Sequence, residues 1–313
     1  MGGKYIFNRI NDSSLDKTEQ SKNNNDIDNT NEEVDDTNQT NVELEKAPNN
    51  NLEFQGLADG EYLTEKGYTL KIENGVAYID GHLIVNKTFA IPNTYQPINP
   101  AQAITGERCN NCLEQEVMDA YKMMESDAAA VGLNIYLASG YRSYSYQEKL
   151  YNNYTAVSGV DKADTYSARA GHSEHQTGLC FDLNCVNDSF ANTDEGRWLD
   201  ENAWIYGFII RYPSYGKRMT GIRFEPWHIR YVGQPHATII SCNRLTLEEY
   251  ILSLEEGICY EAEGYYITRQ QPKDGKIQIP DDCESYIISL DNTGCYIITG
   301  KKKIAKVLYL ETV

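Results

Sequence analysis

Residues 167–182 read SARAGHSEHQTGLCFD, and the interpretation of the whole chain starts from them. The stretch contains two of the chain's five histidines and two glycines, and it ends in the apolar run 179–183. A short apolar run after a polar loop predicts a buried strand. Asp182 lies inside that run, where a carboxylate is costly unless a cation or hydrogen bonds satisfy it. The stretch therefore predicts a functional site and not only a piece of core.

The same stretch brings an imidazole close to this carboxylate. His175 lies in the loop just before the strand, and Gly178 lets the backbone turn sharply between them. A second motif, FEPWHIRYV at residues 224–232, adds His228 and, three residues before it, Glu225. Two histidines and one aspartate form a catalytic zinc set with a fourth position left for water, whose proton a nearby glutamate can accept. This pattern predicts a metallopeptidase.

Five motifs in a fixed order carry a resemblance to a known family. They are LASGYRS at 137–143, Gln147, GHSEHQTGL at 171–179, YGFIIRYP at 206–213 and EPWH at 225–228. In this order they resemble the zinc D,D-peptidase family of the VanY carboxypeptidases and VanX dipeptidases, and the VanY type in particular. The resemblance covers roughly residues 81–233, about half of the chain.

The resemblance implies a fold, a cofactor and a catalytic base. The fold would be α+β, a small antiparallel sheet with flanking helices. His175, Asp182 and His228 would bind Zn²⁺, and Glu225 would be the base. Cys180 departs from the family pattern, which usually has alanine there. On a strand it lies on the same side as Asp182, so we expect a thiol near the metal shell.

Substrate contacts are also implied by the resemblance. Arg142 would contact the substrate carbonyl or the developing oxyanion, although it could instead be a structural ion-pair partner. Gln147 and Ser173 would bind substrate. The implied substrate is a peptidoglycan stem peptide or precursor that ends in D-Ala-D-Ala, from which the terminal D-Ala is removed, with a link to glycopeptide resistance.

Several alternatives stay open. His172 competes with His175 as the metal ligand, although the spacing to Asp182 favours His175. The substrate could be free D-Ala-D-Ala dipeptide, or the chain could be a catalytically inert zinc-containing module that binds wall peptides. A serine mechanism is disfavoured, because the Ser-x-x-Lys match at 14–17 has no partner motifs.

Composition excludes some partners. The chain has 313 residues and a net charge of −18, of which the eleven acidic and three basic residues of 11–52 contribute −8. Such an acidic chain without a basic patch argues against nucleic-acid binding.

No secretory segment and no apolar run of membrane-spanning length is visible in the sequence. The expected location outside the bacterial membrane, at the cell wall, would therefore depend on an anchor not present in this chain. Among eight cysteines, Cys109 and Cys112 have the spacing of a zinc knuckle, but a disulfide or free thiols are favoured because no second Cys-x-x-Cys follows.

The order of patterns predicts three regions. Residues 1–52 are rich in Asn, Asp and Glu and are predicted to be a disordered spacer. Residues 53–241 are predicted to be the catalytic domain, with a β-hairpin lead-in marked by the Asn-Gly turn at 74–75. Residues 242–313 combine a helix, opened by a capping box at 246–249, with short strands, and are predicted to be a β-rich appendage.

Overall fold

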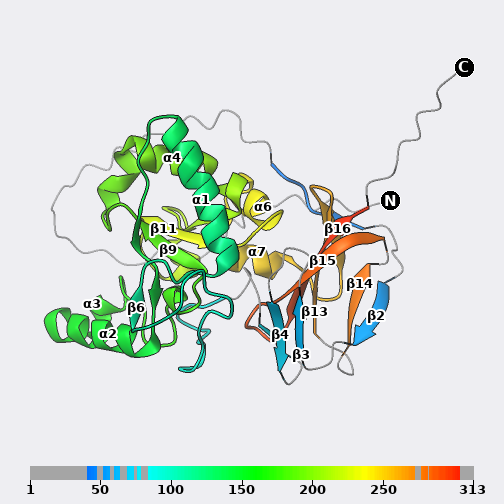
Figure 1. Ribbon diagram of the computed structural model, residues 1–313, viewed down its shortest axis with the longest axis horizontal. Helices are drawn as coiled ribbons and strands as arrows, with labels where there is room; N and C mark the ends of the chain where they lie inside the picture. Colours follow the sequence, from blue (N-terminus) through cyan, green and yellow to red (C-terminus); the bar gives the residue numbers. More distant parts are fainter. Residues whose placement is uncertain are drawn as a thin grey trace, which may run out of the picture.

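The computed structural model describes residues 41–47, 52–56, 60–63, 69–73, 76–78, 84–271, 276–280 and 282–303. It confirms the predicted α+β class, because helices flank a small antiparallel sheet and further strands pair beside it (Figure 1). Within these ranges, no helix combines the length and the apolar character needed to cross a membrane.

A four-stranded sheet forms the centre of the predicted catalytic region. Its strand order is β10–β11–β9–β7, with β7 at Leu137–Ser139, β9 at Cys180–Leu183, β10 at Phe208–Tyr212 and β11 at Glu225–Tyr231. His228 on β11 lies directly opposite Asp182 on β9, and Ser139 on β7 pairs with Asp182 from the other side. Because side chains of a strand alternate between two faces, Phe181 joins the hydrophobic core while Cys180 and Asp182 project from the opposite face.

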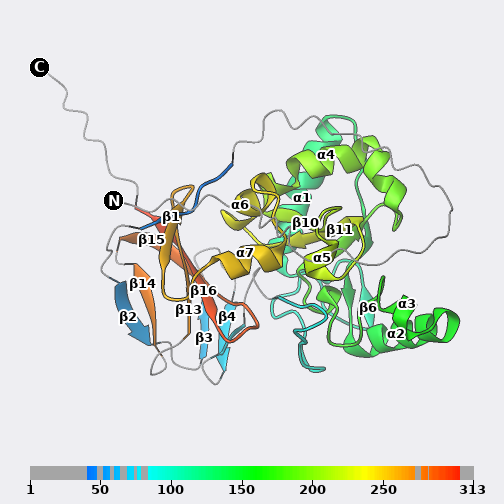
Figure 2. The ribbon, with the colours of Figure 1, turned by 180° about the vertical axis from the view of Figure 1, so that it is seen from behind.

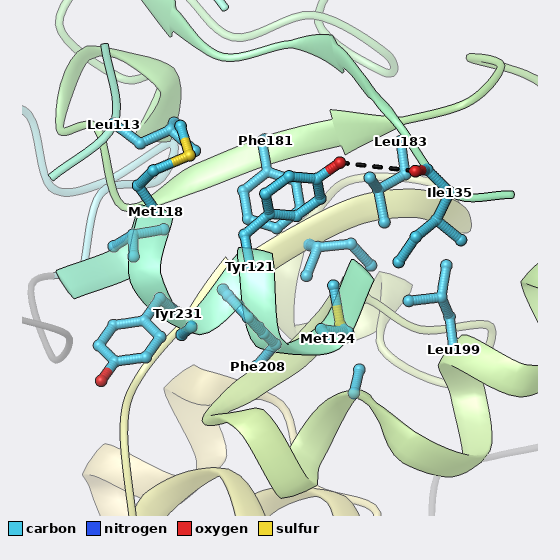
Figure 3. Packing of buried hydrophobic residues seen from close by; sticks show 14 of the residues in the cluster. Leu113, Met118, Tyr121, Met124, Ile135, Phe181, Leu183, Leu199, Phe208 and Tyr231 are labelled. Atoms are coloured by element: carbon cyan, nitrogen blue, oxygen red, sulfur yellow. Dashed lines mark hydrogen bonds between the residues drawn. The ribbon is translucent and has the colours of Figure 1, made fainter. Parts of the chain in front are cut away.

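Helix α1 (Gln115–Ala130) covers the apolar face of this sheet, and the apolar residues at helical spacing over 112–131 predict a helix over nearly the same range. Its buried stripe includes Val117, Tyr121 and Met124, which recur at helical spacing. The Tyr121 and Phe181 rings meet edge to face with centroids 5.4 Å apart, and Phe181 and Phe208 meet in the same way at 5.3 Å (Figure 3). The packed face fixes β9, so the opposite face of the same strand is free to carry a site.

Short elements complete this part of the chain. The capping box at Thr246 and Glu249 is confirmed at the start of α7. The pattern of residues 198–206, ended by Gly207, predicts one helix, but these residues form the end of an α-helix and a 3-10 turn. The bounds are β6 Arg108–Cys109, β8 Tyr141–Arg142, α2 Tyr144–Ser158, α3 Val160–Ala163, η1 Glu174–Gln176, η2 Asp188–Asn192, α4 Asp194–Asn202, η3 Ala203–Tyr206, α5 Lys217–Thr220, α6 His236–Cys242 and α7 Leu247–Ser253.

The C-terminal strands form an antiparallel sheet of their own. Its order is β1–β12–β13–β16–β15, with β1 at Glu45–Lys46, β12 at Cys259–Ala262, β13 at Tyr265–Gln270, β15 at Cys283–Leu290 and β16 at Tyr296–Lys302. The predicted strands after residue 257 are therefore confirmed. His236 on α6 joins this sheet to the rest, because its ring lies between the hydroxyls of Tyr250 and Thr299, at 2.5 and 2.7 Å.

The N-terminal strands lie with this C-terminal sheet and correct two predictions. β1 pairs with β12, and Leu44 beside it is buried, so the predicted spacer is wrong for residues 41–47; residues 1–40 lie outside the described residues. The hairpin of β4 (Thr69–Glu73) and β5 (Val76–Tyr78) is confirmed, with β3 (Gly60–Leu63) beside β4.

The predicted position of that hairpin, as a lead-in to the catalytic domain, is wrong. β2 (Leu52–Gly56) pairs with β14 (Lys276–Pro280), and β5 contacts β15 (Figures 1 and 2). The pairing joins segments more than 200 residues apart, which local sequence patterns do not reveal.

Candidate active site

The seven residues predicted to bind metal, bind substrate or act as base all line one cavity. It is an open cavity on the polar face of the four-stranded sheet, and its wall includes Arg142, Gln147, Ser173, His175, Asp182, Glu225 and His228. These side chains come from a strand end, two helical turns and two neighbouring strands. The fold thus brings together residues that are up to 86 positions apart in the chain.

His175 is held in one tautomer by the backbone. It lies on the turn η1, and its Nδ1 is 2.7 Å from the carbonyl oxygen of Gly140. A carbonyl oxygen only accepts, so Nδ1 carries the proton and the lone pair of the neutral ring is at Nε2. Gly178 makes the turn into β9 possible, because its φ is +72° and an added Cβ would lie 2.7 Å from Pro97.

His228 and Asp182 point at that lone pair from the adjacent strands. Nε2 of His175 lies 3.4 Å from Oδ1 of Asp182, and Nδ1 of His228 lies 3.2 Å from the same oxygen. The other nitrogen of His228, Nε2, lies 3.5 Å from a carboxylate oxygen of Glu174, which favours a proton at Nε2 and a lone pair at Nδ1. Oδ1 of Asp182 therefore lies between two electron-rich ring nitrogens in a buried place.

This donor set fits a zinc ion. Bonds of about 2.0–2.1 Å at tetrahedral angles separate neighbouring ligand atoms by about 3.3 Å, close to the two observed distances. Asp182 is almost fully buried, and its Oδ1 has no hydrogen-bond partner among the described residues. A buried carboxylate oxygen facing two lone pairs is costly without a cation, so the residues present suit the group that the sequence predicted.

Glu225 lies beside these donors on the cavity wall. Its Oε2 is 3.9 Å from Nδ1 of His228. Burial raises the pKa of the Glu225 carboxyl to about 7, against the lowering effect of His228. Pro226 lies where the register of β10 and β11 shifts, and a proline inside a strand is confined to an edge or to a bulge of this kind. This irregularity lets Glu225 and His228 face the same cavity.

The three predicted substrate contacts differ in how they are held. The Arg142 guanidinium donates to Oδ2 of Asp182 at 2.7 Å and to the Ser139 hydroxyl, so it takes the ion-pair role while still lining the cavity. Gln147 donates to the carbonyl of Ala168, and its buried Oε1 has no partner among the described residues. Ser173 is buried at the cavity wall.

The sequence interpretation missed a buried ion cluster beneath His228. Glu174 is fully buried between Arg211, whose Nε donates at 2.7 Å, and Arg230. Burial would raise the pKa of Glu174, but the two arginines outweigh it and hold the pKa well below its usual range. Arg211 also donates to Glu248. The missed signal was an arginine within each of two apolar strands, since a buried charge needs a partner.

His172 and the Cys-x-x-Cys pair are placed away from the donor set. Nδ1 of His172 is 2.7 Å from the carbonyl of Asn86, and His172 is not among the cavity-lining residues. Cys109 and Cys112 form a disulfide, in agreement with the prediction against a zinc knuckle. β6 pairs with β8 through Cys109 and Tyr141, so this disulfide lies next to the strand that carries Arg142.

The geometry is that of a candidate peptidase centre, in which a donor set and a carboxyl with a raised pKa share one cavity. Three comparisons with known proteins agree. The D-alanyl-D-alanine carboxypeptidase of Enterococcus faecium is 36% identical over 200 residues, or 61% of this chain and 62% of that protein. VanXYC of Enterococcus gallinarum, named a bifunctional D-Ala-D-Ala dipeptidase and carboxypeptidase, is 35% identical over 139 residues, 41% of this chain and 73% of that protein. The solved structure of the LdcB LD-carboxypeptidase is 39% identical with a TM-score of 0.50, covering 54% of this chain and 84% of that one.

A family model described as VanY D-alanyl-D-alanine carboxypeptidase matches residues 110–234. The chain belongs to this family. It spans 62–65% of the length of three of the curated relatives that it matches.

Proposed function

We propose that the chain is a zinc-dependent D,D-carboxypeptidase that removes the terminal D-Ala from peptidoglycan stem peptides or their precursors. The observation that carries the proposal is the convergence of His175 Nε2, Asp182 Oδ1 and His228 Nδ1, with separations of 3.4 and 3.2 Å between the carboxylate oxygen and the two ring nitrogens. These residues would hold zinc. When bound, zinc supplies a Lewis acid that polarises a carbonyl and lowers the pKa of water.

The other residues of the site have roles in this reaction. Glu225 accepts the proton of the attacking water and passes it to the leaving amine, and a carboxyl with a pKa near 7 suits both steps. Arg142 holds Asp182 through Oδ2, and its place on the cavity wall supports a second role at the substrate carbonyl. Oε1 of Gln147, which has no hydrogen-bond partner among the residues that the structure describes, can accept a substrate N–H, and Ser173 can add a hydroxyl contact.

The likenesses favour different scissile bonds, so the substrate has to be measured. One relative is named a D-Ala-D-Ala carboxypeptidase, a second has dipeptidase activity in its name, and a solved structure at 39% identity is called an LD-carboxypeptidase. The zinc-loaded chain should be offered a pentapeptide ending in D-Ala-D-Ala, a tetrapeptide ending in an L,D bond, and free D-Ala-D-Ala. Mass spectrometry should show that one alanine is lost from the pentapeptide faster than the tetrapeptide or free D-Ala-D-Ala is cleaved.

The same experiment tests the alternative of an inert wall-binding module. Wild type and Glu225→Gln should be compared with zinc present, because a pure binder needs no base three residues from a ligand. Equal absence of turnover in both proteins on all three substrates would refute the proposed enzyme. Release of alanine from the tetrapeptide alone would move the assignment to an L,D-carboxypeptidase.

We also propose that the protein acts at the cell wall, outside the bacterial membrane, where this substrate is found. The Cys109–Cys112 disulfide supports this location, since disulfides persist in oxidising compartments. Removal of the D-Ala terminus there would be the step that links the chain to glycopeptide resistance.

A further inference from the structure

One thiol faces the donors of the site. Cys180 begins β9, two residues before Asp182, so the two side chains project from the same face of the strand. Cys180 is fully buried. Its Sγ forms a group with one ring nitrogen of His175 and one of His228, and these three atoms all lie within 4.8 Å of one another.

The surroundings of this thiol are not those of a packing residue. A buried free cysteine usually behaves as a small apolar side chain. Sγ of Cys180 instead lies within 4.8 Å of one ring nitrogen of His175 and one of His228, the two histidines of the proposed donor set. Of the six free cysteines, it alone belongs to such a group of metal-binding side chains within the described ranges.

Coordination chemistry accommodates the thiol. A zinc–sulfur bond of about 2.3 Å and a zinc–nitrogen bond of about 2.0–2.1 Å, at a tetrahedral angle, separate sulfur and nitrogen by about 3.6 Å. This separation lies within the 4.8 Å that bounds the observed group. Thiolate and imidazole are both favoured ligands of zinc, and thiolate in addition favours the softer metals.

We propose that Cys180 is a fourth protein donor to the metal of this site. The proposal rests on the proposed function, in which His175, Asp182 and His228 hold zinc. As the sulfur–metal bond forms, the thiol releases its proton to solvent. Four protein donors complete a tetrahedral shell, so the thiolate competes with water for the metal unless the shell expands to five ligands.

X-ray absorption at the zinc edge tests this directly. The full chain is loaded with one zinc per chain, and the spectrum should contain a sulfur neighbour at about 2.3 Å beside nitrogen and oxygen neighbours at about 2.0–2.2 Å. Cys180→Ala should still bind zinc but lose the sulfur neighbour entirely, as should Cys180→Ser. Cys185→Ala is the matched control, because this free cysteine is exposed five residues downstream and should leave the sulfur neighbour in place.

The outcomes separate this inference from the proposed function. A wild-type spectrum with nitrogen and oxygen neighbours only, in a protein that still hydrolyses its peptide, overturns the role of Cys180 alone. A sulfur neighbour that survives in Cys180→Ala also overturns it, because another cysteine would then be the donor. A chain that binds no zinc at all overturns both proposals. A thiolate-to-metal absorption band in the cobalt-substituted protein, absent from Cys180→Ala, would give independent support.

Discussion

Replacing Glu174 with glutamine should weaken both the fold and the metal site. Glu174 is fully buried, and its carboxylate accepts from Arg211 and Arg230 while it also lies 3.5 Å from Nε2 of His228. Glutamine keeps nearly the same shape but removes the negative charge. Within the cluster, two arginines then face one carboxylate, that of Glu248, so its positive charges outnumber its negative ones.

The magnitude follows from these contacts. Removing one partner of a buried ion pair costs about 3–5 kcal/mol of folding free energy. The loss of the carboxylate that orients a metal-binding histidine typically weakens metal binding by about 10- to 100-fold. Both effects should appear in Glu174→Gln, the first in urea unfolding of the metal-free protein and the second in zinc titration against a competing chelator.

Glu248→Gln is the matched control. Glu248 also binds Arg211, with contacts of 2.9 and 2.5 Å, but no contact with His228 is found in the described part of the chain. It should therefore lose stability on a similar scale while its zinc affinity stays within about twofold of wild type. The reasoning is refuted if both variants weaken zinc binding equally, or if Glu174→Gln binds zinc as tightly as wild type.

The remaining predictions concern the reaction. Glu225→Gln should fold and keep zinc but lose about two to four orders of magnitude in turnover, the scale of general-base catalysis, whereas near-wild-type turnover would place the base elsewhere. His228→Ala should lose zinc itself, so zinc content per chain, measured beside the rate, distinguishes the two variants. Burial raises the pKa of Glu225 to about 7, and the proposed base must be deprotonated to accept a proton. kcat/KM should therefore rise with pH and level off above an apparent pKa at or below 7, because a bound cation lowers the pKa of Glu225. The residual rate of Glu225→Gln should lack this pH dependence. Exhaustive chelation should abolish activity and zinc should restore it, and full activity without metal would exclude the metal assignment. β-Lactams should not inhibit, because the proposed water nucleophile forms no acyl-enzyme.

Local signals in the sequence predicted local structure well. The apolar stripe at 112–131 became α1, the capping box at Thr246 opened α7, and the Asn-Gly dipeptide at 74–75 joined β4 to β5. Each of these features depends on residues a few positions apart, whose backbone preferences and hydrogen bonds are readable in the chain itself.

Long-range packing explains what the sequence did not reveal. The sequence around His236, which lies next to a proline and outside any periodic pattern, predicts a surface residue; that prediction is wrong, because the ring is buried between Tyr250 and Thr299. Thr299 lies 63 residues further along the chain, and only the packing of β16 against α6 brings it there. The pairing of β2 with β14 has the same cause, since strand partners are chosen by the three-dimensional arrangement and not by either segment alone.

The net charge of the site favours a substrate that ends in a free carboxylate. The cluster of Glu174, Glu248 and two arginines is balanced, so it contributes little net charge to the cavity above it. In the cavity, Arg142 offsets Asp182 at 2.7 Å, which leaves Glu225 as the remaining acid of the predicted set. With a divalent cation at His175, Asp182 and His228, these groups sum to a positive charge even when Glu225 is ionised; a Cys180 thiolate on the metal would cancel that charge, and it returns when Glu225 is protonated. A carboxypeptidase must bind a substrate whose scissile bond lies next to a free carboxylate. The positive charge left after this pairing suits such an anionic end and disfavours an internal peptide bond, which carries no charge of its own.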